Sequence, residues 1–377
     1  MAVNRLNVGA TNQLLAKAST GQSTNILELQ NTAGVTVAGV DASGNPVGGL
    51  TAPTAAGKNK IINGDFGIWQ RGTSFTAATN TEVFTADRWA VNRNGSGTVT
   101  VSQQSFTAGT APVAGYEAQY FLRFDQSVAG SGATFSVLGT KIEDVRTFAN
   151  QTVTLSFWAK SAAAKTYSAT IRQNFGSGGS SAIDTNTVNF TTSTSWQRFS
   201  FVVNVPSISG KTIGTSSYLH PWINLGLSET TTFDIWGVQL EAGSIATPFV
   251  PAGGGGIGAE LALCKRYCQR YDAKENLPGV IALQGWYFDA NSLRFPLLFE
   301  SEMRAAPTLT YNGSANTDYA TYSNAVLQTG FTFSSERANA RNIVLSATKT
   351  SHGFTNNTSA IFGIATTSGF LIFSSEL

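Results

Sequence analysis

Side chains that could carry out nucleophilic catalysis are scarce in this chain. Among 377 residues there are two histidines, His220 and His352, and a serine or cysteine nucleophile needs a base beside it. His220 lies in Tyr218-Leu-His-Pro-Trp222 without a nucleophile elbow, so we expect it in a loop or a core. The glycines of 253–258 are not followed by the lysine of a phosphate-binding loop. The sequence therefore excludes nucleotide chemistry.

Paired carboxylates are the second possible source of catalysis. Glycan-cleaving enzymes hold two carboxylates roughly 5 to 9.5 Å apart around the scissile bond. The chain has 22 Asp and Glu residues, and no spacing singles out one pair. The available pairs are Glu143 with Asp144, Asp234 with Glu241, and Glu300 with Glu302. The regular short repeats of a parallel β-helix are not seen either. We expect a protein that is not an enzyme, and a glycan depolymerase is the catalytic alternative.

Aromatic, amide and hydroxyl side chains offer binding instead. Sugars stack on flat rings and form hydrogen bonds with amides and hydroxyls. The loops expected at 216–222 and 316–324 are rich in these groups. The candidate ligand contacts in them are Tyr218, His220, Trp222, Tyr319 and Tyr322. The alternative is an ordinary polar β surface, on which such residues are common.

The two cysteines, Cys264 and Cys268, lie four residues apart on a helix expected over 259–271. A disulfide between them would need distorted geometry, so we expect reduced thiols, as in a cytoplasm. A metal site would need two more soft ligands, and both histidines are distant in sequence. We interpret the cysteines as apolar members of a buried stripe with Leu261 and Tyr267. The side chains expected on the outward face are Lys265, Arg266, Gln269 and Arg270.

The composition favours strands over helices. Only 12% of the residues are charged, against roughly 25% in typical soluble domains. The polar surface must therefore be supplied by Ser, Thr, Asn, Gln and Gly, which suit exposed strands and turns. The net charge of +2 comes without a basic run, which argues against nucleic acid and anionic membranes as partners. No stretch of about 18 uncharged apolar residues and no signal-peptide pattern is present. We expect a soluble chain without membrane insertion.

The segment 58–251 reads as closely spaced strands with period-two patterning. In 151–160 the alternation places Val153, Leu155 and Phe157 on one face, and 196–205 and 231–241 repeat the pattern. Such strands over nearly 200 residues predict a β-sandwich, and specifically a jelly roll. The tryptophans expected in its core are Trp69, Trp89, Trp158 and Trp236. Arg88 is expected to pair with Asp87 or Asp65.

The segments before and after residues 58–251 have different sequence patterns from this sandwich. A glycine-rich linker, 252–258, precedes the expected helix and a return to short strands, so 259–377 predicts a second, smaller β-sandwich. At the front, 1–50 contains very short strands with glycine or asparagine at each corner, and 51–57 is a linker. One copy of 1–50 cannot bury a face, whereas three copies around an axis can. We expect a trimeric stalk or anchor there, and a flexible arm is the alternative.

Several phrases occur in a fixed order along the chain. The first is Lys60-Ile-Ile-Asn-Gly-Asp-Phe-Gly-Ile-Trp-Gln-Arg-Gly-Thr-Ser-Phe75, followed by Ala86-Asp-Arg-Trp89. The later ones are Val238-Gln-Leu-Glu-Ala-Gly-Ser-Ile-Ala-Thr-Pro-Phe249, Glu260 to Tyr267, and Met303-Arg-Ala-Ala-Pro-Thr308. Together they resemble a jelly-roll module of tailed-bacteriophage tail-fibre and other virion structural proteins. The resemblance spans about 58–310 and does not cover the first 50 residues.

The resemblance implies an external virion protein, a tail fibre or spike, made in the host bacterial cytoplasm. It implies a homotrimer attached through residues 1–50 to another virion protein and recognising a host-surface polysaccharide. The module is similar in layout to carbohydrate-binding jelly rolls, which often hold calcium between their first and last strands. Asp65 and Asp234 occupy comparable places, but two carboxylates leave most ligands of such an ion missing, so we expect no cofactor, with a structural calcium as the alternative. A head decoration or purely architectural virion protein is the competing function.

Overall fold

The computed structural model describes residues 27–30, 36–40, 46–48, 57–113, 116–227, 229–272, 283–312, 318–323, 326–349, 359–364 and 369–377. The chain divides into two compact units, Met1–Ala55 and Ala56–Leu377. Strands dominate the described residues of both units, which contain one helix. The predicted all-β fold class is confirmed.

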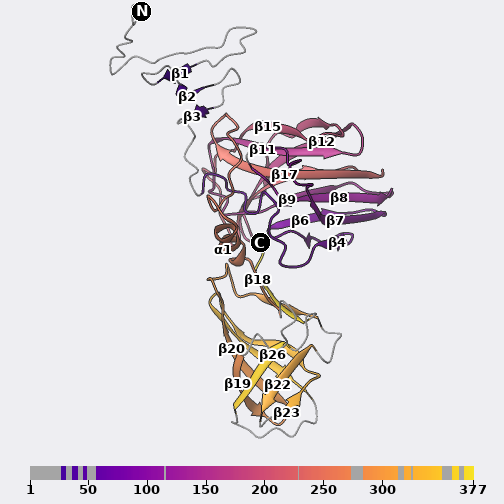
Figure 1. The fold of residues 1–377 in the computed structure, drawn as a ribbon, viewed down its shortest axis with the longest axis vertical. Coiled ribbons are helices and arrows are strands. Elements are labelled where there is room, and N and C mark those ends of the chain that lie inside the picture. Colours follow the sequence, from indigo (N-terminus) through magenta and orange to yellow (C-terminus); the bar gives the residue numbers. More distant parts are fainter. Residues whose placement is uncertain are drawn as a thin grey trace, which may run out of the picture. The chain divides into compact units, whose positions relative to one another are not determined.

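The first unit contains a small antiparallel sheet of three strands in sequential order (Figure 1). The strands are β1 (Leu27–Gln30), β2 (Thr36–Val40) and β3 (Pro46–Gly48). Most of the predicted trimeric segment 1–50 lies outside the described residues, so its trimeric role stays a prediction.

The second unit begins with a sandwich of two antiparallel sheets. The first sheet has the order β13 (Ile183–Asp184), β12 (Lys165–Asn174), β16 (Tyr218–Asn224), β9 (Ser136–Thr140), β6 (Trp89–Arg93) and β5 (Val83–Phe84), with β10 (Ile142–Glu143) beside β16 and β14 (Val188–Thr192) beside β12. The second sheet has the order β15 (Gln197–Asn204), β11 (Thr152–Ser161), β17 (Thr231–Ala242), β8 (Tyr120–Val128), β7 (Thr98–Ser105) and β4 (Ser74–Thr76). Non-sequential neighbours such as β9 and β16 give the crossed connections expected of a jelly-roll-like sandwich.

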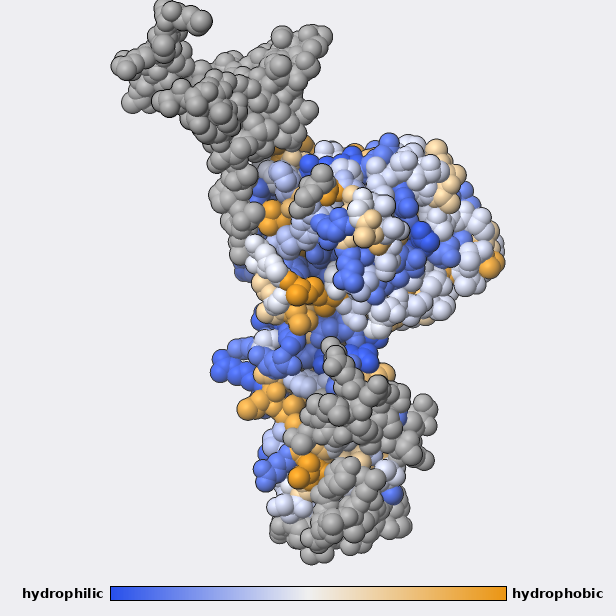
Figure 2. Space-filling model, viewed as in Figure 1, coloured by the Kyte–Doolittle hydropathy of each residue, from blue (hydrophilic) through white to orange (hydrophobic). Residues whose placement is uncertain are grey.

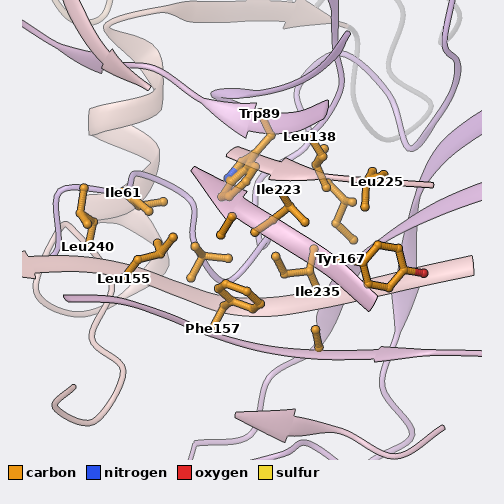
Figure 3. Packing of buried hydrophobic residues seen from close by; sticks show 14 of the residues in the cluster. Ile61, Trp89, Leu138, Leu155, Phe157, Tyr167, Ile223, Leu225, Ile235 and Leu240 are labelled. Carbon is orange, nitrogen blue, oxygen red and sulfur yellow. The ribbon is translucent and has the colours of Figure 1, made fainter. Parts of the chain in front are cut away.

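The core of the sandwich lies between the inner faces of these two sheets. Figure 3 shows Trp89 and Ile223 of the first sheet facing Leu155 and Phe157 of the second. Val153, Leu155 and Phe157 belong to this core, as predicted. Burial does not alternate along β11, however, since Thr154 and Ser156 on the other face are each 1% exposed. Each such side chain contributes roughly 1.5–3 kcal/mol of hydrophobic stabilisation.

The four tryptophans expected in the core divide into two groups. Trp89 and Trp236 are fully buried, as predicted. Trp69 and Trp158 are partly buried and pack against hydrophobic clusters at the edge of the core. Trp236 and Trp158 belong to an aromatic cluster on the outer side of the second sheet, where Phe106 and Phe121 also pack.

The helix is shorter than its periodicity predicted. Helix α1 runs over Ile257–Lys265, and Cys268–Asp272 forms strand β18, which pairs with β27 (Phe370–Ser374). The prediction of a helix to Tyr271 was therefore wrong, because a partner strand about a hundred residues later takes the backbone hydrogen bonds of 268–272. Gln269, predicted to face outward, is 1% exposed and donates a 2.9 Å hydrogen bond to the carbonyl of Ser301.

Both cysteines are free and buried, as predicted. Burial raises the pKa of the Cys268 thiol to about 12 and raises that of Cys264 well above its usual range. A thiol that stays protonated in a closed environment is a poor nucleophile and a poor metal ligand. These residues therefore act as small core side chains.

The strands after the helix form two further antiparallel sheets. The smaller sheet has the order β18, β27 and β21 (Thr308–Tyr311). The larger has the order β23 (Val326–Gln328), β22 (Tyr319–Ser323), β26 (Ser359–Ile364), β19 (Leu283–Asp289), β20 (Ser292–Leu298), β25 (Asn342–Thr348) and β24 (Thr332–Ala338). Their shared core includes Phe295, Phe362 and Phe373.

The end of the chain is pinned to the sandwich by buried ion pairs. Arg88 pairs with the Glu376 carboxylate, donates to the carbonyl of Lys141, and lies 3.5 Å from the ring centroid of Tyr267. Arg71 also pairs with Glu376, at 2.9 Å. The prediction that Arg88 pairs with Asp87 or Asp65 was wrong, since its partner comes from the other end of the sequence.

The visible surface agrees with the weakly charged composition. Figure 2 shows hydrophilic and intermediate residues over most of the visible face of the sandwich, with hydrophobic ones in small patches. In the part of the chain that the structure describes, no helix is long and apolar enough to cross a membrane.

Candidate functional site

Strand β16 brings three predicted ligand contacts onto one face of the first sheet. Tyr218, His220 and Trp222 occupy alternate positions, so their side chains share the outer face. Leu219 and Ile223, at 0% and 3% exposure, point into the core. The prediction of a loop over 216–222 was therefore wrong for the residues from 218 onward. The segment is a strand because it pairs on both sides, with β12 and with β9.

These side chains line a groove of about 480 Å³. The size falls within the range of protein sites for small ligands. The lining combines apolar and aromatic side chains with amides and charges: Glu82, Ala90, Asn92, Phe135, Val137, Lys141, Arg172, Tyr218, His220, Trp222 and Asn224. They come from the outer faces of four neighbouring strands and from the segments that flank them.

The aromatic rings of β16 form a row with a cation over each outer ring. The centroids of Tyr218 and His220 are 6.0 Å apart, and those of His220 and Trp222 are 4.9 Å apart, both edge to face. The Lys141 amino group lies 5.1 Å from the Tyr218 centroid, and the Arg172 guanidinium lies 4.8 Å from that of Trp222. Cations over aromatic faces are held by the ring quadrupole.

The two cations are also held by carboxylates at the rim. Arg172 donates from Nε and Nη2 to both oxygens of Asp184, at 2.6 and 2.7 Å. Lys141 Nζ donates to Glu82 at 2.7 Å and to the main-chain oxygen of Leu377 at 2.7 Å. The hydrogen bonds to Asp184 raise the pKa of Arg172. Both side chains are thus positioned before any ligand arrives.

His220 is a neutral imidazole at the centre of the groove. Burial, together with the charges of Lys141 and Arg172, lowers its pKa to about 3, and Asp184 only partly opposes this. At neutral pH one ring nitrogen is therefore a donor and the other an acceptor. The imidazole can therefore donate a hydrogen bond to a hydroxyl oxygen or accept one from a hydroxyl group.

Ring exposure decides which aromatic side chains can contact a ligand face-on. Trp222 is only 9% exposed, because Arg172 covers it. Its Nε1 donates to Asn224 at 3.0 Å. Phe135 is 37% exposed and Tyr218 is half-buried. Tyr218 and Phe135 therefore offer the open rings, and Trp222 forms the floor.

Asn92 on β6 lines the floor of the same groove. Its side-chain oxygen is buried and has no hydrogen-bond partner within the described chain. Buried acceptors without a partner are rare and cost about 1–3 kcal/mol. The fold therefore keeps an energetically unfavourable unpaired acceptor, the side-chain oxygen of Asn92, at the floor of the groove.

Sequence reasoning missed Asn92, Lys141 and Arg172. They come from three separate strands or strand ends, and nothing in the local sequence marks them as partners of β16. The alternation of polar and apolar residues in 165–174 was the one available signal, since it places Arg172 on an outer face.

The two remaining predicted contacts lie in the sheet that contains β22. Tyr319 is 3% exposed and its hydroxyl donates to the carbonyl of Phe370 at 2.6 Å. Its burial in the core does not support the prediction that it contacts a ligand. Residues 313–317 and the side chain of Tyr322 lie outside the described part of the chain, so Tyr322 stays a prediction.

The carboxylates considered for catalysis each have a cationic partner. The ion pairs are Glu143 with Arg266 at 2.9 Å, Asp144 with Arg146 at 3.0 Å, Asp234 with Arg123 at 2.7 Å, Glu241 with Lys58 at 3.3 Å, Glu302 with Arg341 at 3.1 Å, and Glu300 with Lys265. Each of these carboxylates is therefore already held by a cation, an arrangement that is common in structural ion pairs.

The two carboxylates considered for calcium also have other partners. Asp65 accepts a hydrogen bond from the Tyr116 hydroxyl at 3.0 Å, and Asp234 is gripped by both Nε and Nη2 of Arg123. Among the described residues, no group of three or more His, Cys, Asp or Glu side chains could hold a metal ion.

Comparisons with known proteins give structural neighbours only. No protein family and no curated protein matches the sequence. The enzymatically active domain of tailspike protein 4 from bacteriophage CBA120 matches with 16% identity and a TM-score of 0.33, over 49% of this chain and 21% of that one. A putative sugar binding protein from Bacteroides thetaiotaomicron matches with 16% identity and a TM-score of 0.32, over 49% of this chain and 100% of that one.

A family 11 carbohydrate-binding module from Clostridium thermocellum, in complex with a mixed-linked tetrasaccharide, matches with 12% identity and a TM-score of 0.29. That match covers 45% of this chain and 95% of the module. With TM-scores this low, function has to be argued from the groove itself.

Proposed function

We propose that this chain is a non-enzymatic glycan-binding protein and that the groove on the first sheet holds the glycan. The observation that carries the proposal is the row of Tyr218, His220 and Trp222, set among hydrogen-bonding side chains in one groove. A pyranose ring has apolar C–H faces and a polar rim. The groove offers open aromatic rings for the C–H faces of the sugar, and amide, imidazole and cationic donors for its hydroxyl groups.

The preparation of the groove supports binding as its role. Arg172 and Lys141 are fixed by rim carboxylates, and Asn224 is fixed by hydrogen bonds to Trp222 and to Ser168, the latter at 3.0 Å. Side chains that are already ordered lose little conformational entropy when a ligand arrives. A shallow site of this kind gains affinity when several copies act together.

The proposal extends to the role of the whole chain. The ordered phrases that resemble a virion jelly-roll module support a tail fibre or spike that displays the groove to a host-surface polysaccharide. In this role residues 1–50 attach a homotrimer to another virion protein. The pairing of every candidate catalytic carboxylate with a cation supports binding without cleavage. Incubation with a bound polysaccharide tests that last part, because new reducing ends would reveal a depolymerase.

The test of the binding site is equilibrium binding of the full chain to a panel of purified bacterial surface polysaccharides. Replacing Tyr218 by Ala removes an open ring worth about 0.5–1.5 kcal/mol, so affinity falls roughly 2- to 12-fold. Tyr120→Ala on the second sheet is the matched control and leaves affinity unchanged. Binding that survives Tyr218→Ala, His220→Ala and Asn224→Ala without loss would place the glycan elsewhere.

A further inference from the structure

Two cations bracket the centre of the groove. Arg172 stands directly opposite His220 in the pairing of β12 with β16, and its guanidinium lies over Trp222. Lys141 lies over Tyr218. Tyr218 and Trp222 are the next side chains on either side of His220 on the same face. The imidazole therefore has a positive charge on each side.

The ionisable side chains that line the groove carry an excess of positive charge. Lys141 and Arg172 line it together with a single carboxylate, that of Glu82. Asp184, the partner of Arg172, does not line the groove, and its side chain is 43% exposed. Water screens the charge of Asp184, as it screens that of Arg172, whose side chain is 41% exposed.

Both cations keep donors for a further acceptor. Arg172 uses Nε and Nη2 for Asp184, and within the described chain its Nη1 makes no hydrogen bond. An ammonium group has three donors, and Lys141 uses two of them, for Glu82 and for Leu377. One donor on each side of His220 is therefore left for a ligand.

The charges of Lys141 and Arg172 also act on His220, which lies between them. After burial, the charges of Lys141 and Arg172 are the largest causes that lower its pKa, and they outweigh the opposing Asp184. These two cations give a positive potential beside the imidazole, and a positive potential attracts an anion.

Resting on the proposed glycan-binding function, we infer that the groove selects acidic glycans, whose carboxylate or phosphate group lies over His220 between Lys141 and Arg172. Arg172 Nη1 and Lys141 Nζ donate charge-assisted hydrogen bonds to the anionic group, which are stronger than those to neutral hydroxyls. The neutral parts of the sugar contact Tyr218 and Phe135.

The experiment compares charged and neutral polysaccharides on the full chain. The probes are alginate and polygalacturonate as polyuronates, glycerol teichoic acid as a phosphate polymer, and dextran and mannan as neutral polymers, supplemented by the polysaccharides of the binding panel. Each binder with carboxylates is also tested after carboxyl reduction, and each binder of the panel with pendant phosphomonoesters is tested after enzymatic dephosphorylation. Teichoic acid, whose phosphodiesters form its backbone, is compared directly with the neutral polymers. We expect each treatment to lower the affinity of its binder at least tenfold. A loss after carboxyl reduction identifies a carboxylate ligand, and a loss after dephosphorylation identifies a phosphate ligand.

Variants separate a specific site from general electrostatic attraction. Arg172→Gln lowers affinity for the acidic form at least fivefold and leaves affinity for the neutralised form unchanged. Arg146→Gln removes a cation of the same charge whose side chain is 61% exposed. This control variant changes neither the affinity for the acidic form nor that for the neutralised form.

Two results would overturn the inference in distinguishable ways. If neutral polymers or neutralised binders bind as tightly as acidic ones, the ligand class is wrong while the glycan-binding function stands. If no polysaccharide of either kind binds, the proposed function itself fails. Equal losses from Arg172→Gln and Arg146→Gln would show attraction by overall charge and would also overturn the assigned site.

Discussion

Gly139 is the residue that lets His220 lie against strand β9. A Cβ atom built on Gly139 would stand 2.7 Å from Nε2 of His220 and 2.8 Å from the carbonyl oxygen of Pro221. Real Cβ atoms do not approach other heavy atoms so closely. The floor of the groove is therefore shaped by a missing side chain on the neighbouring strand.

Gly139→Ala should damage the groove and the fold together. The methyl group forces the imidazole and the backbone of β16 to shift, and overpacking of this kind costs about 1–3 kcal/mol. Thermal unfolding should show a lower midpoint, and polysaccharide affinity should fall by more than the loss of folded protein explains. Gly258→Ala is the matched control, since a Cβ there meets nothing within 4 Å and alanine favours a helix. Equal stability of the two variants would contradict the close packing.

The pH dependence of stability should carry a signature of His220. Its pKa falls from 6.5 to about 3 on folding, so below about pH 6.5 the unfolded chain takes up a proton that the folded chain refuses. The stability contributed by this residue is present above pH 6.5 and is lost as the pH falls toward 3. The charged groups that face it are Lys141, Arg172 and Asp184.

His220→Gln, which cannot titrate, should therefore lose less stability than the wild type between pH 7 and pH 4.5. Melting temperatures of both proteins over this range provide the comparison. An NMR titration of the imidazole supplies the direct check. A midpoint near 6.5 in the folded protein would show that the ring is not enclosed as described.

The contact between Glu376 and two arginines should hold the end of the chain on the sandwich. The side chains of Glu376 and Arg88 are 5% and 2% exposed. Glu376→Gln therefore removes the carboxylate that pairs with the buried Arg88 guanidinium and leaves Arg71 with Asp87, at 4.0 Å. Breaking a buried pair in this way costs about 3–5 kcal/mol. Chemical denaturation and limited proteolysis at the C-terminal residues should both reveal the loss.

Glu302→Gln provides the comparison for that experiment. Glu302 pairs with Arg341 at 3.1 Å, but the two side chains are 55% and 76% exposed. Exposed pairs contribute at most about 1 kcal/mol, so this variant should unfold like the wild type. If the two glutamate variants behave alike, the C-terminal contact does not stabilise the fold.

Local patterns predicted the fold where apolar and polar residues alternate within one strand. Val153, Leu155 and Phe157 were assigned correctly because their period is visible over a few residues. The strand 268–272 was taken for helix because its partner, 370–374, lies about a hundred residues away. A helical stripe and a short strand are indistinguishable in so few residues when the partner is unknown.

The site was predictable only in part for the same reason. Residue type predicted Tyr218, His220 and Trp222 as ligand contacts, and the structure places them on one face of β16, although the pattern predicted a loop there. Arg172 and Lys141 could not be found, since only strand pairing brings them beside β16. Tyr319 has the same residue type as Tyr218 but lies in a core, and residue type alone does not separate the two.

The two cysteines should be unreactive in the folded protein. A thiolate is the reacting species, and burial raises the pKa of Cys268 to about 12 and that of Cys264 well above its usual range. A thiol reagent such as a disulfide dye should label neither residue at pH 8 within minutes, and both in guanidinium chloride. Because Cys264 lies in the last turn of α1 and Cys268 begins β18, labelling also reports local opening of this junction. Glu376→Gln should speed it, since the same carboxylate pins Arg88 over Tyr267 between the two cysteines. Rapid labelling of the folded wild type would contradict the closed packing around β18.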